Sequence, residues 1–480
     1  MTPRPPTSGA PVAAWLPGLE VPTRPLPVGA AEVQVPVLTP DDLDRLAAHL
    51  TANRRRYLAE RSTASILASL DAVARRWQDP AYPLRREAER WIAAATGYAA
   101  ETVAWGLAAG TARAGREGLS ALLAAEVPPG ALDGWVPHPG GRGWTRAFGP
   151  ELTGFVFSGN VPGIPAFHLA TALLIRSAAL AKTAAGEPLF AALWCRSLAE
   201  VDPELGACVA AAYWPGEAAE LHRAAFRRAG AVVAFGADAS LDALARALPP
   251  AVRLIRHGQK LSFGCVAREA LTPGRLPDLA RRAARDVALF DQQGCVSPHA
   301  LWVEEGGAVS PAAFAEALAG ALAELGARWP RAPLSPEAAA AIQLARSEAR
   351  FSPGARVWAS PGSTAWTVVF QPAPAEGLRP SPLNRFVRVY AVPDLGHLPQ
   401  HLAPWAGYLQ TCSFAGPRDR ALALAWALAP LGLSRLCPLG RSQEPAPHWR
   451  HDGEPQLLPL LRWVDAEEPA GGEEPAGGKA

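Results

Sequence analysis

The chain has 480 residues, of which 49% are hydrophobic and 19% charged, so it can bury apolar cores and is not disordered as a whole. Lysine and arginine (46) nearly balance aspartate and glutamate (44), which gives a net charge of +2 and argues against nucleic-acid binding as the main activity. At about 150 residues per domain, the length predicts two large domains or three smaller ones.

The cysteines and the apolar stretches indicate the cellular compartment in which the protein is expected. The six cysteines are sparse and form no CxxC pair, so they predict a reducing, cytoplasmic environment rather than a disulfide framework. The longest apolar stretches, 165–175 and 421–433, are shorter than the roughly 18 residues that a membrane-spanning helix needs. We therefore expect a cytoplasmic protein with neither a secretory leader nor an integral membrane segment.

The N-terminal part is expected to change from an extended arm to helices. Frequent prolines make residues 1–40 irregular, with at most short strands. Helical periodicity then begins at Asp41, which is expected to cap the first helix, and it continues to about residue 125. A stretch rich in glycine, proline and tryptophan, 128–150, predicts loop or short strand.

From residue 154 onward, strand and helix patterns alternate. The expected strands are 154–158, 178–183, 231–235 and 253–257, and the expected helices are 166–176, 188–199 and 240–248. Such alternation predicts a parallel, doubly wound sheet. A second series of strands and helices starts near residue 262, so the sequence predicts two α/β domains.

Common single motifs are absent. The sequence has no GxGxxG fingerprint, no Walker lysine motif and no GxSxG elbow. No cluster has the spacing of metal ligands; His448 and His451 lie close together, but a surface or hydrogen-bonding role is favoured over a metal site.

One cysteine differs from the others in its local sequence. Cys295 follows a helical pattern in the polar turn DQQGCVSP, whereas Cys195, Cys208 and Cys412 lie in helix or strand patterns typical of a core. A cysteine in a loop is more open to solvent and to lowering of its pKa by nearby backbone N–H groups. Cys295 is therefore a candidate nucleophile, with a non-catalytic loop thiol as the alternative.

An ordered series of motifs is more informative than any one of them. The series is FVFSGNVPG with Asn160, ALAKTAAGEP with Lys182 and Thr183, VVAFG with Gly236, RHGQK with Lys260, and DQQGC with Cys295. With SRLCPLGRSQEPAPHWRHDG near the C-terminus, it resembles the aldehyde dehydrogenase superfamily, and more closely the LuxC-type long-chain acyl-CoA reductases known from bacterial luminescence operons. The resemblance covers about residues 150 to 465. It implies an aldehyde dehydrogenase-like fold, with two doubly wound, Rossmann-like α/β domains and the active site between them.

The resemblance also implies roles for individual residues. Cys295 matches the nucleophile, and Asn160 matches the asparagine whose amide, with the backbone N–H at the cysteine, stabilises the tetrahedral oxyanion. Lys182, followed by Thr183, matches the lysine at a strand end that contacts the cofactor ribose, and Gly236 matches the glycine at the cofactor pyrophosphate. The alternative to these roles is that Cys295 is an ordinary loop thiol, Asn160 a turn residue and Lys182 a surface residue.

Two positions depart from the pattern of the superfamily. Hydrolytic members have a glutamate general base where this chain has Arg256, and an arginine cannot deprotonate water at pH 7. His257 is expected to pack or to hydrogen-bond, so hydrolysis of an acyl-enzyme should be slow. Ala185 stands where a glutamate often disfavours a phosphorylated ribose, so NADPH is expected, with NADH possible.

We therefore expect NADPH-dependent reduction of a long-chain fatty acyl-CoA to an aldehyde through an acyl-cysteine thioester. The alternatives are a CoA-acylating aldehyde dehydrogenase that uses NAD, and a cysteine acyltransferase or thioesterase without redox chemistry. The expected partners are an acyl thioester, an acyl-donor enzyme and further copies of the chain, with no nucleic acid and no metal. The expected divisions are an arm (1–40), an NADP-binding part (41–261), a catalytic domain (262–438), a returning segment (439–465) and a disordered tail (466–480).

Overall fold

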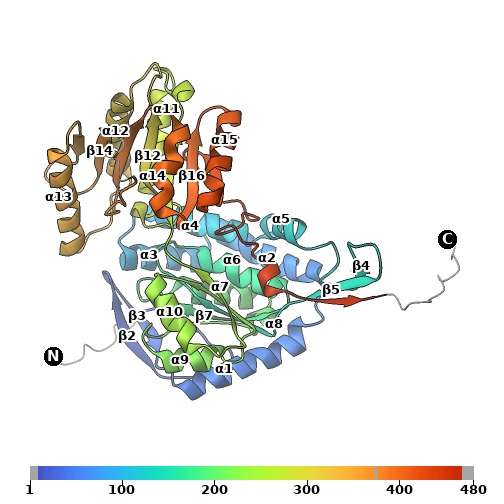
Figure 1. The fold of residues 1–480 in the computed structure, drawn as a ribbon. Coiled ribbons are helices and arrows are strands. Elements are labelled where there is room, and N and C mark those ends of the chain that lie inside the picture. The colour runs from blue at the N-terminus through green and yellow to red at the C-terminus, as the bar shows by residue number, and fades with distance from the viewer. Residues whose placement is uncertain (1–8, 373, 375–376, 468–480) are drawn as a thin grey trace.

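Two parallel-stranded sheets, each covered by helices, organise the computed structural model, which describes residues 9–372, 374 and 377–467 (Figure 1). The N-terminal sheet has the order β1 (Ala14–Trp15), β8 (Val209–Tyr213), β7 (Ala178–Thr183), β6 (Leu152–Val156), β9 (Ala231–Phe235) and β10 (Arg253–His257). All its pairs are parallel except β1 with β8. Four of these strands were expected from the sequence, and the prediction of a doubly wound sheet is confirmed.

The C-terminal sheet is the second doubly wound unit. Its order is β13 (Arg356–Ala359), β14 (Thr367–Pro372), β15 (Phe386–Val392), β12 (Pro298–Glu304), β11 (Leu261–Val266), β16 (Leu409–Ala415) and β17 (Arg435–Pro438). Only β13 pairs antiparallel with its neighbour. The central strands β12, β15 and β16 are buried almost throughout, as expected for parallel strands that are covered on both faces.

Helices cover both sheets and fill the space between them. Those of the first half are α1 (Pro40–Asn53), α2 (Thr63–Gln78), α3 (Pro83–Thr96), α4 (Ala100–Arg113), α5 (Arg116–Glu126), α6 (Ile164–Leu174), α7 (Phe190–Val201), α8 (Pro203–Gly206), α9 (Ala219–Phe226) and α10 (Asp238–Ala247). Those of the second half are α11 (Leu276–Ala288), α12 (Pro311–Arg328), α13 (Pro336–Phe351), α14 (Leu398–Leu402) and α15 (Arg418–Leu428). In the described residues, no helix combines the length and the apolar character needed to cross a bilayer.

The N-terminal region is more regular than its prolines suggest. Strands β2 (Thr23–Val28) and β3 (Ala31–Pro36) form an antiparallel hairpin. The first helix is capped by Thr39 rather than by Asp41, because the Thr39 side chain accepts a hydrogen bond from the backbone of Asp42, and Pro40 occupies the first turn, where its missing N–H leaves no hydrogen bond unmade. The prediction of Asp41 as the cap is therefore wrong.

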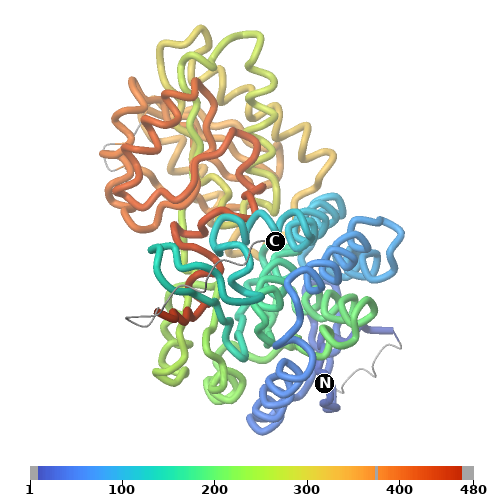
Figure 2. The backbone as a smooth tube through the Cα atoms, turned by 90° about the vertical axis from the view of Figure 1, so that its right-hand side faces the viewer, coloured from blue at the N-terminus to red at the C-terminus, as the bar shows by residue number. Residues whose placement is uncertain are grey.

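The C-terminal segment returns from the second half to the first. Strand β18 (Arg462–Ala466) pairs with β5 (Trp144–Phe148), which also pairs with β4 (Val136–Pro137). Figure 2 shows this red segment passing from the orange half down along the blue-to-green half. The expected tail, 466–480, lies outside the described residues except for its first two positions, of which Ala466 belongs to β18.

The strand order determines where a ligand can bind. After β6 the chain adds β7 and β8 on one side, and it then crosses back to add β9 and β10 on the other side of β6. Loops leaving the carboxyl ends of β6 and β9 diverge at this switch point, which leaves a crevice of the kind that binds ligands in open α/β sheets. The C-terminal sheet and the returning segment lie over this edge.

Candidate active site

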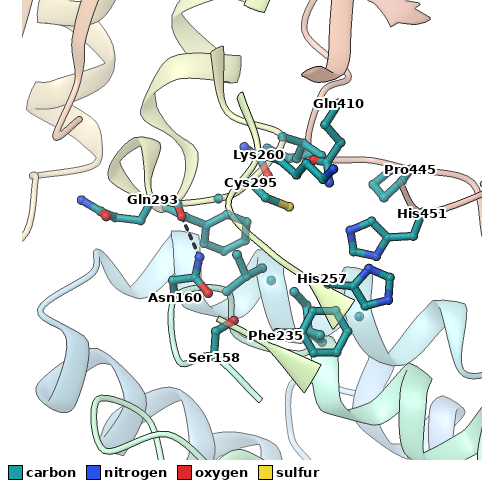
Figure 3. A pocket seen from close by; sticks show the side chains of 18 of the residues that line it. Ser158, Asn160, Phe235, His257, Lys260, Gln293, Cys295, Gln410, Pro445 and His451 are labelled. Carbon is teal, nitrogen blue, oxygen red and sulfur yellow. Dashed lines mark hydrogen bonds between the residues drawn. The ribbon is translucent and has the colours of Figure 1, made fainter. Parts of the chain in front are cut away.

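A cavity of about 600 Å³ lies where the two halves and the C-terminal segment meet (Figure 3). Asn160 and Gly236 come from loops after β6 and β9, His257 ends β10, Cys295 precedes β12, and His451 lies on the C-terminal segment. The structure thus brings three of the predicted site residues, Cys295, Asn160 and Gly236, to one cavity.

A strained turn presents the cysteine. Phe290, Asp291 and Gln292 have φ values of 52°, 49° and 68°, a left-handed conformation that residues other than glycine rarely adopt. The buried carboxylate of Asp291 lies 2.7 Å from the guanidinium of Arg385 and accepts a hydrogen bond from the backbone of Ala332. These interactions hold the turn in a conformation that it would not adopt alone.

The loop 383–385, which contacts this turn, has the same strained backbone conformation. Leu383, Asn384 and Arg385 also have positive φ values, of 63°, 59° and 64°. The Gln293 amide donates to the Asn384 side chain at 2.9 Å, and the Asn384 backbone N–H donates to the Asp291 carbonyl at 3.1 Å. The two loops therefore stabilise each other and fix the segment that carries Cys295.

Cys295 is exposed to the cavity, whereas the other five cysteines are buried. Although its side chain opens into the cavity, it lies deep among protein atoms, and this burial, with the charge of Asp452, raises the pKa of the thiol to about 11. The Gln410 side chain and the backbone N–H groups of Cys295 and Val296 act in the opposite direction but are outweighed. The loop placement is confirmed, and the backbone N–H groups lower the thiol pKa as expected, but burial and the charge of Asp452 raise it by more.

Asn160 is attached directly to the cysteine loop. Its Nδ2 donates to the carbonyl oxygen of Gln293 at 2.7 Å, and its Oδ1 is buried without a hydrogen-bond partner. Because an amide nitrogen carries two hydrogens, the second N–H of Asn160 is available for an oxygen atom placed beside Cys295.

A cluster that the sequence did not predict lies beside the cysteine. The Nδ1 atom of His257 lies 2.8 Å from Oδ2 of Asp452, whose other oxygen accepts from the Gln410 amide at 2.7 Å. The His451 ring stacks on His257, with ring centres 4.2 Å apart and planes inclined by 15°. Gln410 also acts to lower the pKa of Cys295, so the amide that binds Asp452 influences the thiol as well.

The charge states of this cluster follow from its surroundings. Burial raises the pKa of Asp452, but the hydrogen bonds from His257 and Gln410 and the nearby His451 outweigh it and lower the pKa to about 2. Burial, with the neighbouring His257, lowers the pKa of His451 to about 3. At neutral pH the cluster therefore contains a carboxylate and a neutral His451, and the Asp452 carboxylate orients His257 through its Nδ1 atom.

The same three side chains have ligand atoms within 4.8 Å of one another, a spacing that a metal ion can use. However, the two imidazoles are stacked nearly parallel, and both oxygens of Asp452 already accept hydrogen bonds. The arrangement fits a hydrogen-bonded acid–base cluster better than a coordination sphere. The absence of a metal stays a prediction.

Arg256 does not face the cavity. Side chains alternate along a strand, so Arg256 points away and pairs with Asp242, whereas His257 lines the cavity. His257 both packs, stacked on Phe235 at 4.7 Å, and hydrogen-bonds, as expected. The carboxylate beside His257 comes from Asp452 on the C-terminal segment and not from the strand that carries His257, so slow hydrolysis of an acyl-enzyme stays a prediction.

Gly236 provides open space at the carboxyl end of β9. A Cβ atom built on this residue would meet a single described atom, the Cβ of Ser240 at 3.9 Å. A ligand can therefore approach the backbone here closely, as a dinucleotide pyrophosphate requires.

Lys182 and Thr183 end β7, which pairs with β6 on the side opposite to β9. Neither residue lines the cavity itself. The Lys182 ammonium donates to the Thr183 carbonyl at 3.3 Å, and burial lowers its pKa to about 8 against the charge of Glu217. The Thr183 hydroxyl is buried without a partner. The Lys182 ammonium and the unpaired Thr183 hydroxyl lie one strand away from the cavity. They suit an extended, polar ligand that reaches from the cavity to the end of β7.

Solved structures identify the class of fold. An NAD-dependent benzaldehyde dehydrogenase from Corynebacterium glutamicum superposes with a TM-score of 0.69 at 15% identity, covering 95% of this chain and 97% of its own. Aldehyde dehydrogenase 21 from Physcomitrella patens gives a TM-score of 0.71 at 14% identity, covering 95% and 98%. The protein therefore has the aldehyde dehydrogenase fold, with two Rossmann-like domains, as predicted.

Sequence comparison identifies the family. The model of the acyl-CoA reductase (LuxC) family matches residues 58–463. Long-chain acyl-protein thioester reductases from Aliivibrio fischeri and Vibrio harveyi are each 25% identical, over 342 and 345 residues, and each match covers 70% of this chain and 68% of the relative. The chain belongs to the acyl-CoA reductase (LuxC) family and is an oxidoreductase.

Proposed function

We propose that the enzyme reduces a long-chain fatty acyl thioester to an aldehyde, with NADPH as reductant and Cys295 as the acyl carrier. The observation that carries this proposal is the exposed thiol of Cys295 in a cavity shared with Asn160 and with the open backbone at Gly236. Membership of the LuxC family and the names of the relatives support the substrate class.

The first half-reaction forms an acyl-enzyme. The Cys295 sulfur attacks the thioester carbonyl, and the negative charge moves to the carbonyl oxygen. The free N–H of Asn160 and the backbone N–H of Cys295 stabilise this oxyanion, each donor contributing a few kcal/mol. The carrier thiol leaves and the acyl group stays on Cys295, which keeps it in place for reduction.

The thiol needs a base, because a pKa of about 11 leaves it protonated at neutral pH. We assign this role to His257, whose Nδ1 is engaged by Asp452 so that Nε2 can accept a proton. The proton that His257 takes from Cys295 is then available for the departing carrier thiol. Cys295, His257 and Asp452 would thus act together as nucleophile, base and orienting carboxylate.

NADPH would supply the hydride that converts the acyl thioester into a thiohemiacetal, and the collapse of that species releases the aldehyde and restores Cys295. The residues proposed to hold it are Gly236 at the pyrophosphate and Lys182 and Thr183 at the ribose. Ala185 supports NADPH over NADH, because a glutamate there would repel the 2′-phosphate.

The preference for NADPH can be tested by two opposite changes of charge. Ala185→Glu should weaken the binding of NADPH more than that of NADH. Glu217→Gln removes the carboxylate whose charge acts on Lys182, so it should strengthen NADPH binding more than NADH binding. Fluorescence titration of both cofactors measures the two ratios, and equal effects on the two cofactors would contradict the assignment.

The acyl donor is proposed to be a fatty acyl-CoA or an acyl group carried on a protein. The relatives are named for acyl-protein thioesters, which supports an acyl-donor enzyme as a partner. Loss of NADPH absorbance with fatty acyl-CoA of several chain lengths, with the aldehyde identified as product, tests the function. Oxidation of aldehyde alone would favour the CoA-acylating dehydrogenase.

One observation favours a second function. His257 with Asp452 could equally activate a water molecule, which would make the protein a thioesterase. The ratio of aldehyde to fatty acid formed in the presence of NADPH separates the two functions.

A further inference from the structure

Arg113 is a cation on the wall of the cavity that the proposed reaction does not use. Trp105, Ala109 and Arg113 lie at successive i, i+4 positions and form one face of α4 that lines the cavity. The guanidinium of Arg113 lies over the ring of Phe167 on α6, 4.4 Å from its centre. Arg113 therefore packs on an aromatic ring at the cavity wall, and the charged or titratable side chains that interact with it electrostatically, Arg435, His168 and His451, are all basic.

The Arg113 guanidinium has no hydrogen-bonding partner. Its Nε is buried and unpaired, and within residues 9–372, 374 and 377–467 the side chain forms no hydrogen bond or ion pair. Burial, with the positive charge of Arg435, lowers its pKa to about 10, so it stays charged at neutral pH. Among the described residues that line the cavity, the one acidic residue is Glu444, which already pairs with Arg285 and Arg441.

Two buried arginines of this protein are compensated by polar partners, whereas Arg388, which is buried over the Phe386 ring with two unpaired nitrogens, does not line the cavity as Arg113 does. Arg385 pairs with the carboxylate of Asp291 at 2.7 Å, and the guanidinium of Arg346 donates to Thr367, Ser363 and Trp366. Burying a charge without such partners costs several kcal/mol. A cavity that held only an alkyl chain would gain more from an apolar residue at position 113.

We propose that Arg113 binds a carboxylate on the acyl group of the substrate, so that the enzyme accepts acyl thioesters with an anionic group on the chain. This inference rests on the proposed function and specifies its substrate class. The planar guanidinium fork matches a carboxylate in a bidentate arrangement. Trp105, Ala109 and Phe167 would contact the methylene groups between the carboxylate and the thioester.

The charge of the cavity favours a carboxylate over the phosphates of a thiol carrier. Among the described residues that line it, the other strong base is Lys260, which donates to the carbonyl of Gly407 at 3.0 Å. One unengaged guanidinium balances one carboxylate, whereas the several charges of a nucleotide carrier would need more cations.

The test uses the full chain and thioesters that lack phosphate. Octanoyl and suberyl mono-thioesters of N-acetylcysteamine have the same number of carbons, and only the suberyl group ends in a carboxylate. Arg113→Met should lower the ratio of kcat/KM for suberyl over octanoyl by about 10- to 100-fold, the loss expected for one charge-assisted hydrogen-bonded pair. Arg113→Lys should recover part of that ratio.

The control is an arginine that stacks on a ring elsewhere. Arg90 is exposed and lies over Trp91, 5.2 Å from the ring centre, and Arg90→Met should leave the ratio unchanged. An equal decrease for both thioesters in Arg113→Met would indicate packing and overturn the proposal. An effect seen only with CoA thioesters would assign Arg113 to a carrier phosphate and also overturn it.

A binding measurement separates this proposal from the proposed function. Calorimetric titration of the suberyl mono-thioester into Cys295→Ala requires no turnover, and its affinity should decrease when Arg113→Met is added. If the wild-type enzyme reduced no fatty acyl thioester of any chain length, the proposed function would fail, and the titration would still decide the role of Arg113. Equal affinities with and without Arg113 would overturn the proposal.

Discussion

The side-chain amide of Asn160 donates its Nδ2 hydrogen to the carbonyl oxygen of Gln293 at 2.7 Å, two residues before Cys295. This bond joins the loop after β6 in the N-terminal sheet to the loop that enters β12 in the C-terminal sheet. The amide is therefore fixed relative to the sulfur before any substrate binds. Such preorganisation is what allows a donor to stabilise an oxyanion without reorganising during the reaction.

Asn160→Ala is predicted to lower kcat by about 10²- to 10³-fold, because one oxyanion donor is lost. Cofactor affinity should change little, since Asn160 is not among the proposed cofactor ligands. Single-turnover acylation and NADPH titration measure the two effects separately. A change confined to the KM for NADPH would instead assign Asn160 to the cofactor loop.

Asp452→Asn is predicted to change thiol reactivity and turnover in opposite directions. The Asp452 charge raises the pKa of Cys295, so its removal should lower that pKa and speed alkylation by iodoacetamide at pH 8. Turnover should decrease by at least tenfold, because His257 loses the carboxylate that orients it.

In the wild-type enzyme, the rate of Cys295 alkylation should rise about tenfold per pH unit from pH 7 to 10, as follows from a thiol pKa of about 11.

Asp242→Asn is the matched control for Asp452→Asn. Asp242 pairs with Arg256 outside the cavity, so its amide variant should change neither rate. A parallel decrease of alkylation and turnover in Asp452→Asn would contradict the proposed arrangement and indicate a general loss of structure.

The strands of the N-terminal sheet were largely predictable because buried parallel strands are continuous apolar runs. The run 178–183 matches β7 and 231–235 matches β9 residue for residue. Strand β8 was missed, since its sequence VAAAY is rich in alanine, which favours helix. Its place is decided by pairing with β7, which is a tertiary effect.

The site was predictable only where short motifs carry it. Cys295, Asn160 and Gly236 lie within recognisable motifs, and they meet in one cavity. Asp452 lies in the C-terminal motif HWRHDG but was given no role, and Arg113 lies in none of the motifs, because the neighbours that set the surroundings of each are far away in the sequence. His257 and Asp452, for example, are separated by 195 positions.

Lys182→Ala is predicted to weaken NADPH binding and to leave acylation of Cys295 nearly unchanged. The reason is geometric: Lys182 ends β7 and lies outside the cavity that contains Cys295. Fluorescence titration of NADPH and mass spectrometry of the acyl-enzyme report on the two half-reactions in one variant. Unchanged NADPH affinity would show that Lys182 is not a cofactor ligand.

Arg385→Met is predicted to lower the free energy of unfolding by about 3–5 kcal/mol, because it leaves the buried Asp291 carboxylate unpaired. Acylation of Cys295 should slow as well, since the strained turn before it loses its support. Arg282→Met is the control: Arg282 pairs with Asp278 on the surface, and its loss should cost less than about 1 kcal/mol. Urea unfolding of both variants measures the difference, and equal losses would contradict the structural role of the buried pair.

The central claim is a covalent acyl group on Cys295 that leaves as aldehyde. The enzyme is incubated with radiolabelled fatty acyl-CoA without NADPH, the labelled peptide is identified by mass spectrometry, and NADPH is then added while aldehyde and acid are quantified. We predict label on Cys295 alone, none in Cys295→Ala, and discharge mainly as aldehyde once NADPH is present. Label on another cysteine, or rapid release of fatty acid without NADPH, would contradict the account.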